Sequence, residues 1–421
     1  NLAKMNVFDI IALFIFLAGL FIFLNIYVLK LPSTIGLMIM ALLLSLCLLS
    51  AGYLIPSLKI DAIHIEEYEY GDIIYQIVLS FLLFSSALNM DFKKLAKHKK
   101  AVLVLATVGV IISTVVIGTS VYFMLGWIGV ELSYLYCLVF GALISPTDPI
   151  AITEYIRRFK ISKNVEMKIE GESLFNDGIA VVLALTLLDL AGGQADHQLG
   201  FFEVIYVFLA DVGGGIFIGL VMGYVGYRLL KYVDNDEFHV EILITITIVL
   251  FGTTMADFMH VSSKQAAVIM GLVIGNEGRS TEVTGIAGDY VFKFWNLIQD
   301  SFATMLFVLI GLEMLVIPLR FDYFAAGFFA VNLVLLGRWM SVFIPIKILS
   351  VKKNFEPHTI SIMSWGTLRG GIPIALSLTL PEFSGKDVII TMTYVVVVWT
   401  IIYQGLTIPV LIKSLVPNNK N

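Results

Sequence analysis

The sequence predicts an all-α protein that crosses a membrane about thirteen times. Of its 421 residues, 58% are hydrophobic and only 14% are charged, whereas a soluble domain carries about 25% charged residues. The apolar residues gather in runs close to the length of about 20 residues that spans a hydrocarbon core. No soluble domain of useful size remains between these runs. A polytopic membrane protein is therefore expected.

The candidate spans follow one another along the whole chain. The ninth is short, and the fifth, sixth and twelfth carry charged residues in their middle. The predicted spans cover residues 6–29, 32–54, 72–90, 101–126, 132–156, 166–190, 201–231, 239–259, 262–276, 294–317, 322–350, 358–379 and 388–413.

Basic residues predict the orientation of these spans. The loops "DFKKLAKHKK" (91–100) and "RRFKISKNVEMK" (157–168) are strongly basic, whereas "DAIHIEEYEYGD" (61–72) is acidic. Cytoplasmic loops carry an excess of Lys and Arg. The sequence therefore predicts a multi-pass protein of the plasma (inner) membrane, with the N-terminus outside and the C-terminus in the cytoplasm.

Several classes of function find no support in the sequence. It lacks CxxC, HExxH, GxSxG and GxxxxGK[ST] motifs, which argues against metal hydrolases, serine hydrolases and ATP-driven pumps. No basic face with interleaved aromatic residues suggests nucleic acid as a partner. Cys47 and Cys137 both lie in apolar runs and are expected to be packing residues. We expect no enzyme, no cofactor and no nucleic-acid partner, only membrane lipids around the spans.

Two segments interrupt the helical pattern at membrane depth. "LISPTDPIAI" (143–152) contains Pro146 and Pro149, and "WGTLRGGIPIAL" (365–376) contains a proline after two glycines. Proline removes a backbone donor, so Pro149 frees the carbonyl of Ser145 from its helical partner. Irregular backbone at this depth is tolerated only inside protein or along a water cavity. We expect discontinuous helices, although ordinary proline kinks are the competing interpretation.

The two interrupted spans are the fifth and the twelfth, and they run in opposite directions because their positions differ by seven, an odd number. An inverted repeat produces this arrangement, with span seven joining two six-helix halves. The sequence therefore predicts two inverted six-helix repeats in which two discontinuous helices cross.

Five ionisable residues are placed deep in the spans: Asp148, Glu172, Asp177, Arg338 and Arg369. Each costs about 2.5–3.5 kcal/mol at the centre of an inserted helix, so such residues face the bundle interior and pair with one another. Their formal charges leave one carboxylate without an opposite charge. A buried carboxylate in that position must bind a proton or a cation. Two mutually exclusive positive ligands at one site suggest an exchange mechanism.

Helical periodicity divides the polar residues of "ESLFNDG" (172–178) between two faces. Ser173 and Asp177 are four residues apart and share one face, whereas Glu172 and Asn176 share another, about 100° away. We expect Asp177 to be the ion ligand, with Ser173 as a neutral oxygen donor beside it. Thr147 and the carbonyls freed by proline could complete an oxygen shell for a hard cation. The competing interpretation makes Asp177 a helix-packing residue.

Four motifs resemble the monovalent cation/proton antiporters, in the sodium/proton exchanger branch that includes NhaP-type proteins and the animal NHE exchangers. The motifs are "GALISPTDPIAI" (141–152), "GESLFNDGIAVV" (171–182), "FVLIGLEM" (307–314) and "WGTLRGGIPIALSL" (365–378). They occur in the family's order, and thirteen spans is the family's number. The resemblance implies the NhaA/NhaP-like antiporter fold.

The resemblance also implies the ion site. The adjacent pair Asn176 and Asp177 resembles the Asn-Asp motif of the electroneutral branch, in which Asp177 would bind Na+ (or Li+) and H+ alternately. The implied Na+ ligands are Asp177, Ser173, Thr147 and Asp148. These transported ions would be the substrates, in the service of pH and sodium homeostasis.

Further roles follow from the same resemblance. Glu172 and Arg338 would form a buried structural ion pair. Arg369 would lie at the helix crossover and face helix C-terminal ends. No role follows for Asp211, which lies in the middle of span seven.

The family is also dimeric and moves its ion site by an elevator-like step. The implied domains are dimerisation helices in 1–95, the first half of the core ion-transport domain in 96–191, a linker and further dimerisation helices in 192–318, and the second half of the core in 319–421.

Two functions from other classes remain as alternatives. An intramembrane aspartyl protease would use Asp148 and Asp177 as a catalytic dyad. A passive cation channel would need a ring of repeated ligands around an axis, which one asymmetric cluster does not offer. Coupled flux of Na+ and H+ in proteoliposomes distinguishes an antiporter from both.

Overall fold

The protein is described from a computed structural model, in which the described residues are 7–54, 70–149, 152–153, 155–156, 159, 161–192, 201–233, 238–280, 286–312, 314, 317, 320–351, 355–378 and 380–415. Within them the secondary structure is helical apart from one isolated β-bridge. The expected all-α architecture is therefore confirmed. Most of the acidic segment 61–72 and the pair Arg157 and Arg158, which both entered the topology prediction, lie outside the described residues.

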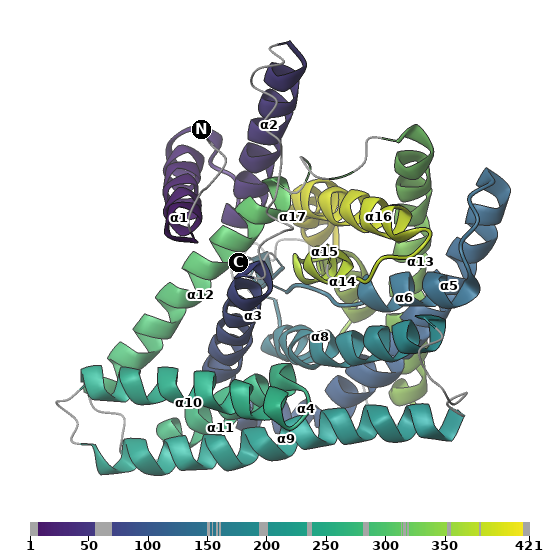
Figure 1. The fold of residues 1–421 in the computed structure, drawn as a ribbon. Coiled ribbons are helices and arrows are strands. Elements are labelled where there is room, and N and C mark those ends of the chain that lie inside the picture. Colours follow the sequence, from purple (N-terminus) through teal and green to yellow (C-terminus); the bar gives the residue numbers. More distant parts are fainter. Residues whose placement is uncertain are drawn as a thin grey trace.

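Helices from the start of the chain and from its middle form one packed group. They are α1 (Val7–Leu24), α2 (Ser33–Leu54), α3 (Tyr70–Asn89), α9 (Phe201–Tyr232), α10 (Phe238–Phe258), α11 (Ser263–Ser280) and α12 (Ile286–Leu312). Helix α11 packs along α3 and α9, α10 covers α9 and α11, and α12 runs across α2 and α3. Figure 1 shows α9, α10 and α11 together at the bottom, with α12 rising from them towards α2.

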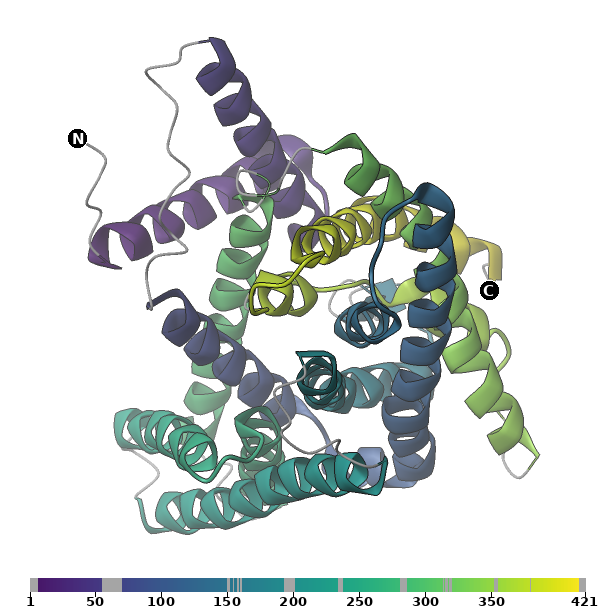
Figure 2. The ribbon, with the colours of Figure 1, turned by 45° about the vertical axis from the view of Figure 1, so that its right-hand side comes forward.

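The remaining helices pack mainly against one another. They are α4 (Phe92–Val104), α5 (Val110–Ile128), α6 (Tyr134–Leu143), α8 (Lys163–Gly192), α13 (Phe321–Ser350), α14 (Thr359–Gly366), α15 (Ile372–Leu378), α16 (Lys386–Trp399) and α17 (Gly405–Leu415). Helix α5 lies on α6 and α13, α13 lies on α16, and α8 lies on α4 and α6. This second group meets the first chiefly where α8 contacts α9, α11 and α3. Figure 2 shows the same helices from a second direction.

Three π-helical turns occur in the described part of the chain: η1 (Asn25–Leu29) follows α1, η3 (Leu105–Gly109) joins α4 to α5, and η5 (Thr400–Gln404) joins α16 to α17. Such turns often occur at functional sites. The turn η5 supports the helix break between α14 and α15, because Thr400 Oγ1 accepts a hydrogen bond from the N–H of Arg369 at 3.3 Å.

Each predicted span coincides with a helix or with consecutive helical pieces. Six helical stretches of the described chain are long and apolar enough to cross a membrane: Leu95–Ile128, Lys163–Gly192, Leu209–Tyr232, Phe238–Phe258, Phe321–Ser350 and Lys386–Leu415. Shorter apolar helices accompany them. The protein is a multi-pass membrane protein, whereas the total of thirteen spans stays a prediction.

The predicted helix interruptions are present. Helix α6 ends at Leu143 and an extended segment follows it, whereas Gly366 ends α14 and five residues separate it from α15. These two breaks bring backbone groups and charged side chains together inside the second group of helices, where the candidate site lies.

Candidate ion-binding site

The two helix breaks cross through a single antiparallel β-bridge between Asp148 and Leu368. The N–H of Asp148 donates to the carbonyl of Leu368 at 2.8 Å, and the N–H of Leu368 donates back at 3.3 Å. The bridge satisfies backbone groups that the helices leave unpaired, which matters because an unpaired group in an apolar region costs several kcal/mol. It also fixes the position of Asp148 relative to the second break.

Arg369 neutralises the end of α6. Its Nη1 donates to the carbonyls of Ser145 at 2.6 Å and Pro146 at 3.0 Å. The carbonyl of Ser145 is the one that Pro149 leaves without a helical donor. A cation at a helix C-terminus is stabilised by the helix dipole. Among the described residues, the guanidinium of Arg369 thus bonds to backbone carbonyls and to no carboxylate.

Glu172 and Arg338 form a two-pronged ion pair between α8 and α13. Arg338 Nη1 lies 2.5 Å from Glu172 Oε1, and Nη2 lies 3.0 Å from Oε2. Glu172 is only 2% exposed and Arg338 only 4% exposed. Arg338 also donates to the carbonyl of Met363 and to Thr367 Oγ1, at 3.0–3.3 Å. The pair therefore joins α8, α13 and the start of the second break.

Thr147 links the two polar faces of α8. Ser173 Oγ donates to the backbone carbonyl of Thr147 at 2.5 Å, and Asn176 Nδ2 donates to Thr147 Oγ1 at 2.9 Å. The face predicted for Asn176 differs from that of Ser173, but both residues contact the same threonine. Each acceptor oxygen of Thr147 retains a second lone pair, so both can still face a cation.

The two aspartates lie beside this oxygen cluster. Asp177 is half-buried on α8, and Asp148 is half-buried at the first break, close enough for their charges to interact. Within the described part of the chain, Asp177 makes no hydrogen bond or ion pair. Glu172 is paired with Arg338, so the formal charges of the two aspartates and of Arg369 leave the site with one net negative charge.

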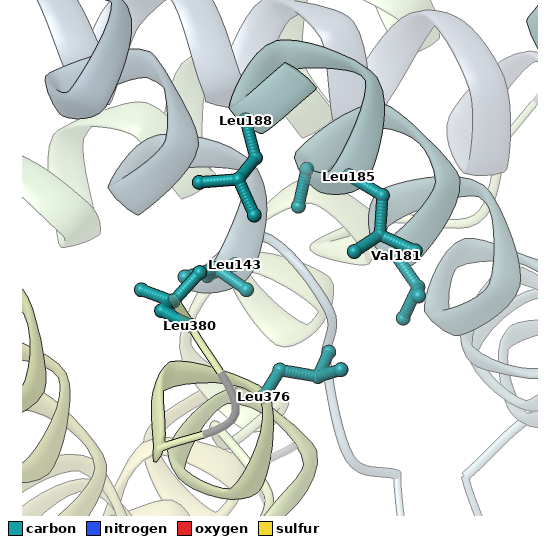
Figure 3. A pocket seen from close by; sticks show the side chains of 7 residues that line it. Leu143, Val181, Leu185, Leu188, Leu376 and Leu380 are labelled. Carbon is teal, nitrogen blue, oxygen red and sulfur yellow. The ribbon is translucent and has the colours of Figure 1, made fainter. Parts of the chain in front are cut away.

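A hollow lined by aliphatic side chains begins one helical turn beyond Asp177 on α8. Beyond Asp177, α8 presents Val181, Leu185 and Leu188 to this hollow, which also receives leucines from α6 and α15. Figure 3 shows these side chains converging from the three segments. No charged residue lines this hollow, so it offers nothing that would solvate a bare carboxylate.

A second buried ion pair was not expected from the sequence. Lys168, one helical turn before Glu172, is only 4% exposed and lies 2.7 Å from Glu356 in the segment between α13 and α14. Its ammonium also lies 4.8 Å from the ring of Phe355. Burial raises the pKa of Glu356, but hydrogen bonds, first that from Lys168, outweigh burial and lower this pKa to about 2.

The crossing of two broken helices at a cluster of buried charges is the arrangement of a secondary ion transporter of the membrane. Known proteins identify the family. Residues 12–414 match the family "Sodium/hydrogen exchanger, transmembrane". The chain is 36% identical to the Na(+)/H(+) antiporter NhaP of Pseudomonas aeruginosa, over 97% of this chain and 96% of that protein. It is 31% identical to NhaH of Halobacillus dabanensis, over 92% of this chain and 93% of that protein.

A solved structure has the same fold. The sodium proton antiporter MjNhaP1 of Methanocaldococcus jannaschii superposes with a TM-score of 0.76, over 98% of this chain and 99% of that one, at 22% identity. The chain belongs to the sodium/hydrogen exchanger family, a family of transmembrane ion transporters and not of enzymes. The expected family is therefore confirmed, and the alternative of an intramembrane aspartyl protease is excluded.

Proposed function

We propose that the protein exchanges Na+ (or Li+) for H+ across the plasma membrane, with one Na+ and one H+ competing for Asp177, in the service of pH and sodium homeostasis. The observation that carries this proposal is the pairing of Glu172 with Arg338. It leaves Asp177 as the partly buried carboxylate on α8 that has no fixed partner among the described residues. A carboxylate in that position is neutralised by a cation or a proton.

The proposed Na+ ligands are oxygen atoms of Asp177, Asp148, Ser173 and Thr147. Oxygen atoms are the ligands that hard cations prefer. Asn176 holds Thr147 in place at 2.9 Å and, by its resemblance to the Asn-Asp motif, marks electroneutral exchange. Either ligand neutralises the site. The empty site carries its charge past an aliphatic wall, where desolvation makes the movement costly.

The movement we propose is an elevator step of a core domain, residues 96–191 and 319–421, against dimerisation helices in 1–95 and 192–318. The support is the packing: helices of each group contact one another far more than they contact the other group. In this proposal the protein is a homodimer whose N-terminus lies outside and whose C-terminus lies in the cytoplasm.

Flux in proteoliposomes tests the proposal. A Na+ gradient should drive opposite H+ movement in the intact protein, and Asp177→Asn should abolish it. Asp189→Asn is the matched control, because Asp189 is an exposed carboxylate on the same helix. Clamping the membrane potential at different values should leave the rate unchanged if exchange is electroneutral. Exchange by Asp177→Asn at the rate of the intact protein would overturn the assignment.

A further inference from the structure

Gln265 brings α11 into contact with the ion-binding helix. It lies in the first turn of α11 and is only 2% exposed. Its side-chain amide rests directly on Gly178 of α8, so that a methyl group added at Gly178 would collide with Nε2. Gly178 follows Asp177 in the chain. The amide therefore covers α8 beside the carboxylate to which the ion is proposed to bind.

The start of α11 is attached to α9 and not to α8. The N–H of Ser262 donates to the backbone carbonyl of Asp211 on α9 at 3.2 Å. A Cβ added at Gly215 of α9 would lie 3.1 Å from the Cβ of Gln265. Lys264 lies within electrostatic range of Asp211. Gln265 is thus held by α9, and Asp211 gains a role as an anchor of this turn.

The contact of Gln265 with Gly178 of α8 consists of packing alone, unlike the hydrogen-bonded attachment of α11 to α9. Among the described residues, the amide of Gln265 makes no hydrogen bond to α8 or to any other segment. Buried polar groups normally have a partner. Shear motions slide packed helices past each other, and sliding at this contact would break no hydrogen bond. The surface between α8 and α11 has the properties of one that opens and closes.

We propose that Gln265 is a positioning residue of the transport cycle, which holds α8 at Gly178 in one of the two positions of the ion site and releases it when the site moves. This inference rests on the exchange proposed above. In this proposal the movement occurs across the surface between α8 and α11, and α11 stays fixed to α9.

Reversible cross-linking tests it. The full-length protein would carry Gly178→Cys and Gln265→Cys in a Cys47→Ala background, because Cys47 is the exposed cysteine and Cys137 is buried. A Cβ added at position 178 would lie 3.2 Å from Gln265 Cγ, which is one bond beyond Gln265 Cβ, so the two Cβ atoms come within reach of the separation of about 3.5–4.5 Å that a disulfide requires. We expect oxidation to join α8 to α11 and to stop Na+/H+ exchange, and a reductant to restore the rate of the reduced variant.

The matched control is Gly223→Cys with Val273→Cys, a pair that joins α9 to α11 on one side of the surface. A Cβ at position 223 would lie 3.0 Å from the Cβ of Val273, and this cross-link should leave exchange unchanged. Exchange by the cross-linked 178–265 protein at its reduced rate would overturn the proposal, as would failure of this pair to cross-link at all. Melting temperatures of the oxidised proteins separate blocked movement from misfolding. A defect in the proposed function itself would instead appear as absent exchange in the intact protein.

Discussion

Arg338 holds both carboxylate oxygens of Glu172, at 2.5 and 3.0 Å, across the boundary between α13 and α8. The same guanidinium reaches the carbonyl of Met363 at the end of α14. The pair is a fork-to-fork contact of the kind that arginine forms with carboxylates. It fixes the direction of Glu172 and so separates this carboxylate from Asp177, five residues later on the same helix.

Breaking the pair of Glu172 and Arg338 should lower the stability of the fold and leave the Na+ affinity unchanged. Removal of one partner from a buried pair leaves an uncompensated charge and costs about 3–5 kcal/mol. We expect Glu172→Gln to lower the melting temperature strongly in detergent, with the apparent Na+ affinity of the folded fraction unchanged. Lys386→Gln is the control, because its partner Glu382 is 89% exposed and exposed pairs contribute little. A stable Glu172→Gln protein with weakened Na+ binding would make Glu172 a ligand.

Thr147 should act through its hydroxyl group. Thr147→Val keeps the shape of the side chain but leaves Asn176 Nδ2 without the acceptor that it has at 2.9 Å. The substitution also removes an oxygen atom that the proposal assigns to Na+, and a loss of about 1.4 kcal/mol in ion binding corresponds to an apparent Na+ affinity about tenfold weaker. Thr147→Ser retains the hydroxyl and should bind Na+ like the intact protein. Equal affinities for the valine and serine variants, measured by calorimetry, would show that the hydroxyl has no part in the site.

The pair of Lys168 and Glu356 gives a pH-dependent contribution to stability. The pKa of Glu356 lies at about 2 in the folded protein against an ordinary value of 4.5. A depressed pKa stabilises the folded state above the ordinary value, and the contribution fades as the pH falls from there towards the folded pKa. The melting temperature of Glu356→Gln should therefore lie below that of the intact protein by a constant amount near neutral pH.

Below about pH 4.5, this difference should shrink, because the intact protein then loses the charge that the variant lacks. The exposure of Glu356 is 28%, and solvent screening limits the size of the effect. A difference that grows as the pH falls would contradict the assignment.

Local chain chemistry predicted the two helix breaks. Pro149 has no N–H to donate to the carbonyl of Ser145, and Arg369 Nη1 donates to that carbonyl instead, at 2.6 Å. The fifth and twelfth spans were recognisable because proline and glycine act on the backbone next to them. The role of Arg369 at the crossover came from the family resemblance and stays a prediction.

Contacts between distant segments could not be read from spacing. Glu172 and Arg338 are 166 positions apart and were paired only through the family resemblance. Lys168 and Glu356, which are 188 positions apart, looked like ordinary loop charges in the sequence. Gln265 carried no signal at all, because its position depends on a glycine in another helix. Periodicity assigns a residue to a face of its own helix, but packing decides which helix covers that face.

The binding of Na+ to the purified protein tests most directly the claim that Na+ and H+ compete for Asp177. In a weakly buffered solution below the pH at which Asp177 loses its proton, the binding of each Na+ should release about one proton. Calorimetry in buffers of different ionisation enthalpy measures both quantities. We predict that proton release disappears at higher pH and that Asp177→Asn neither binds Na+ nor releases a proton, whereas Asp189→Asn behaves as the intact protein. Sodium binding to Asp177→Asn with the affinity of the intact protein, or binding without proton release at any pH, would contradict the account.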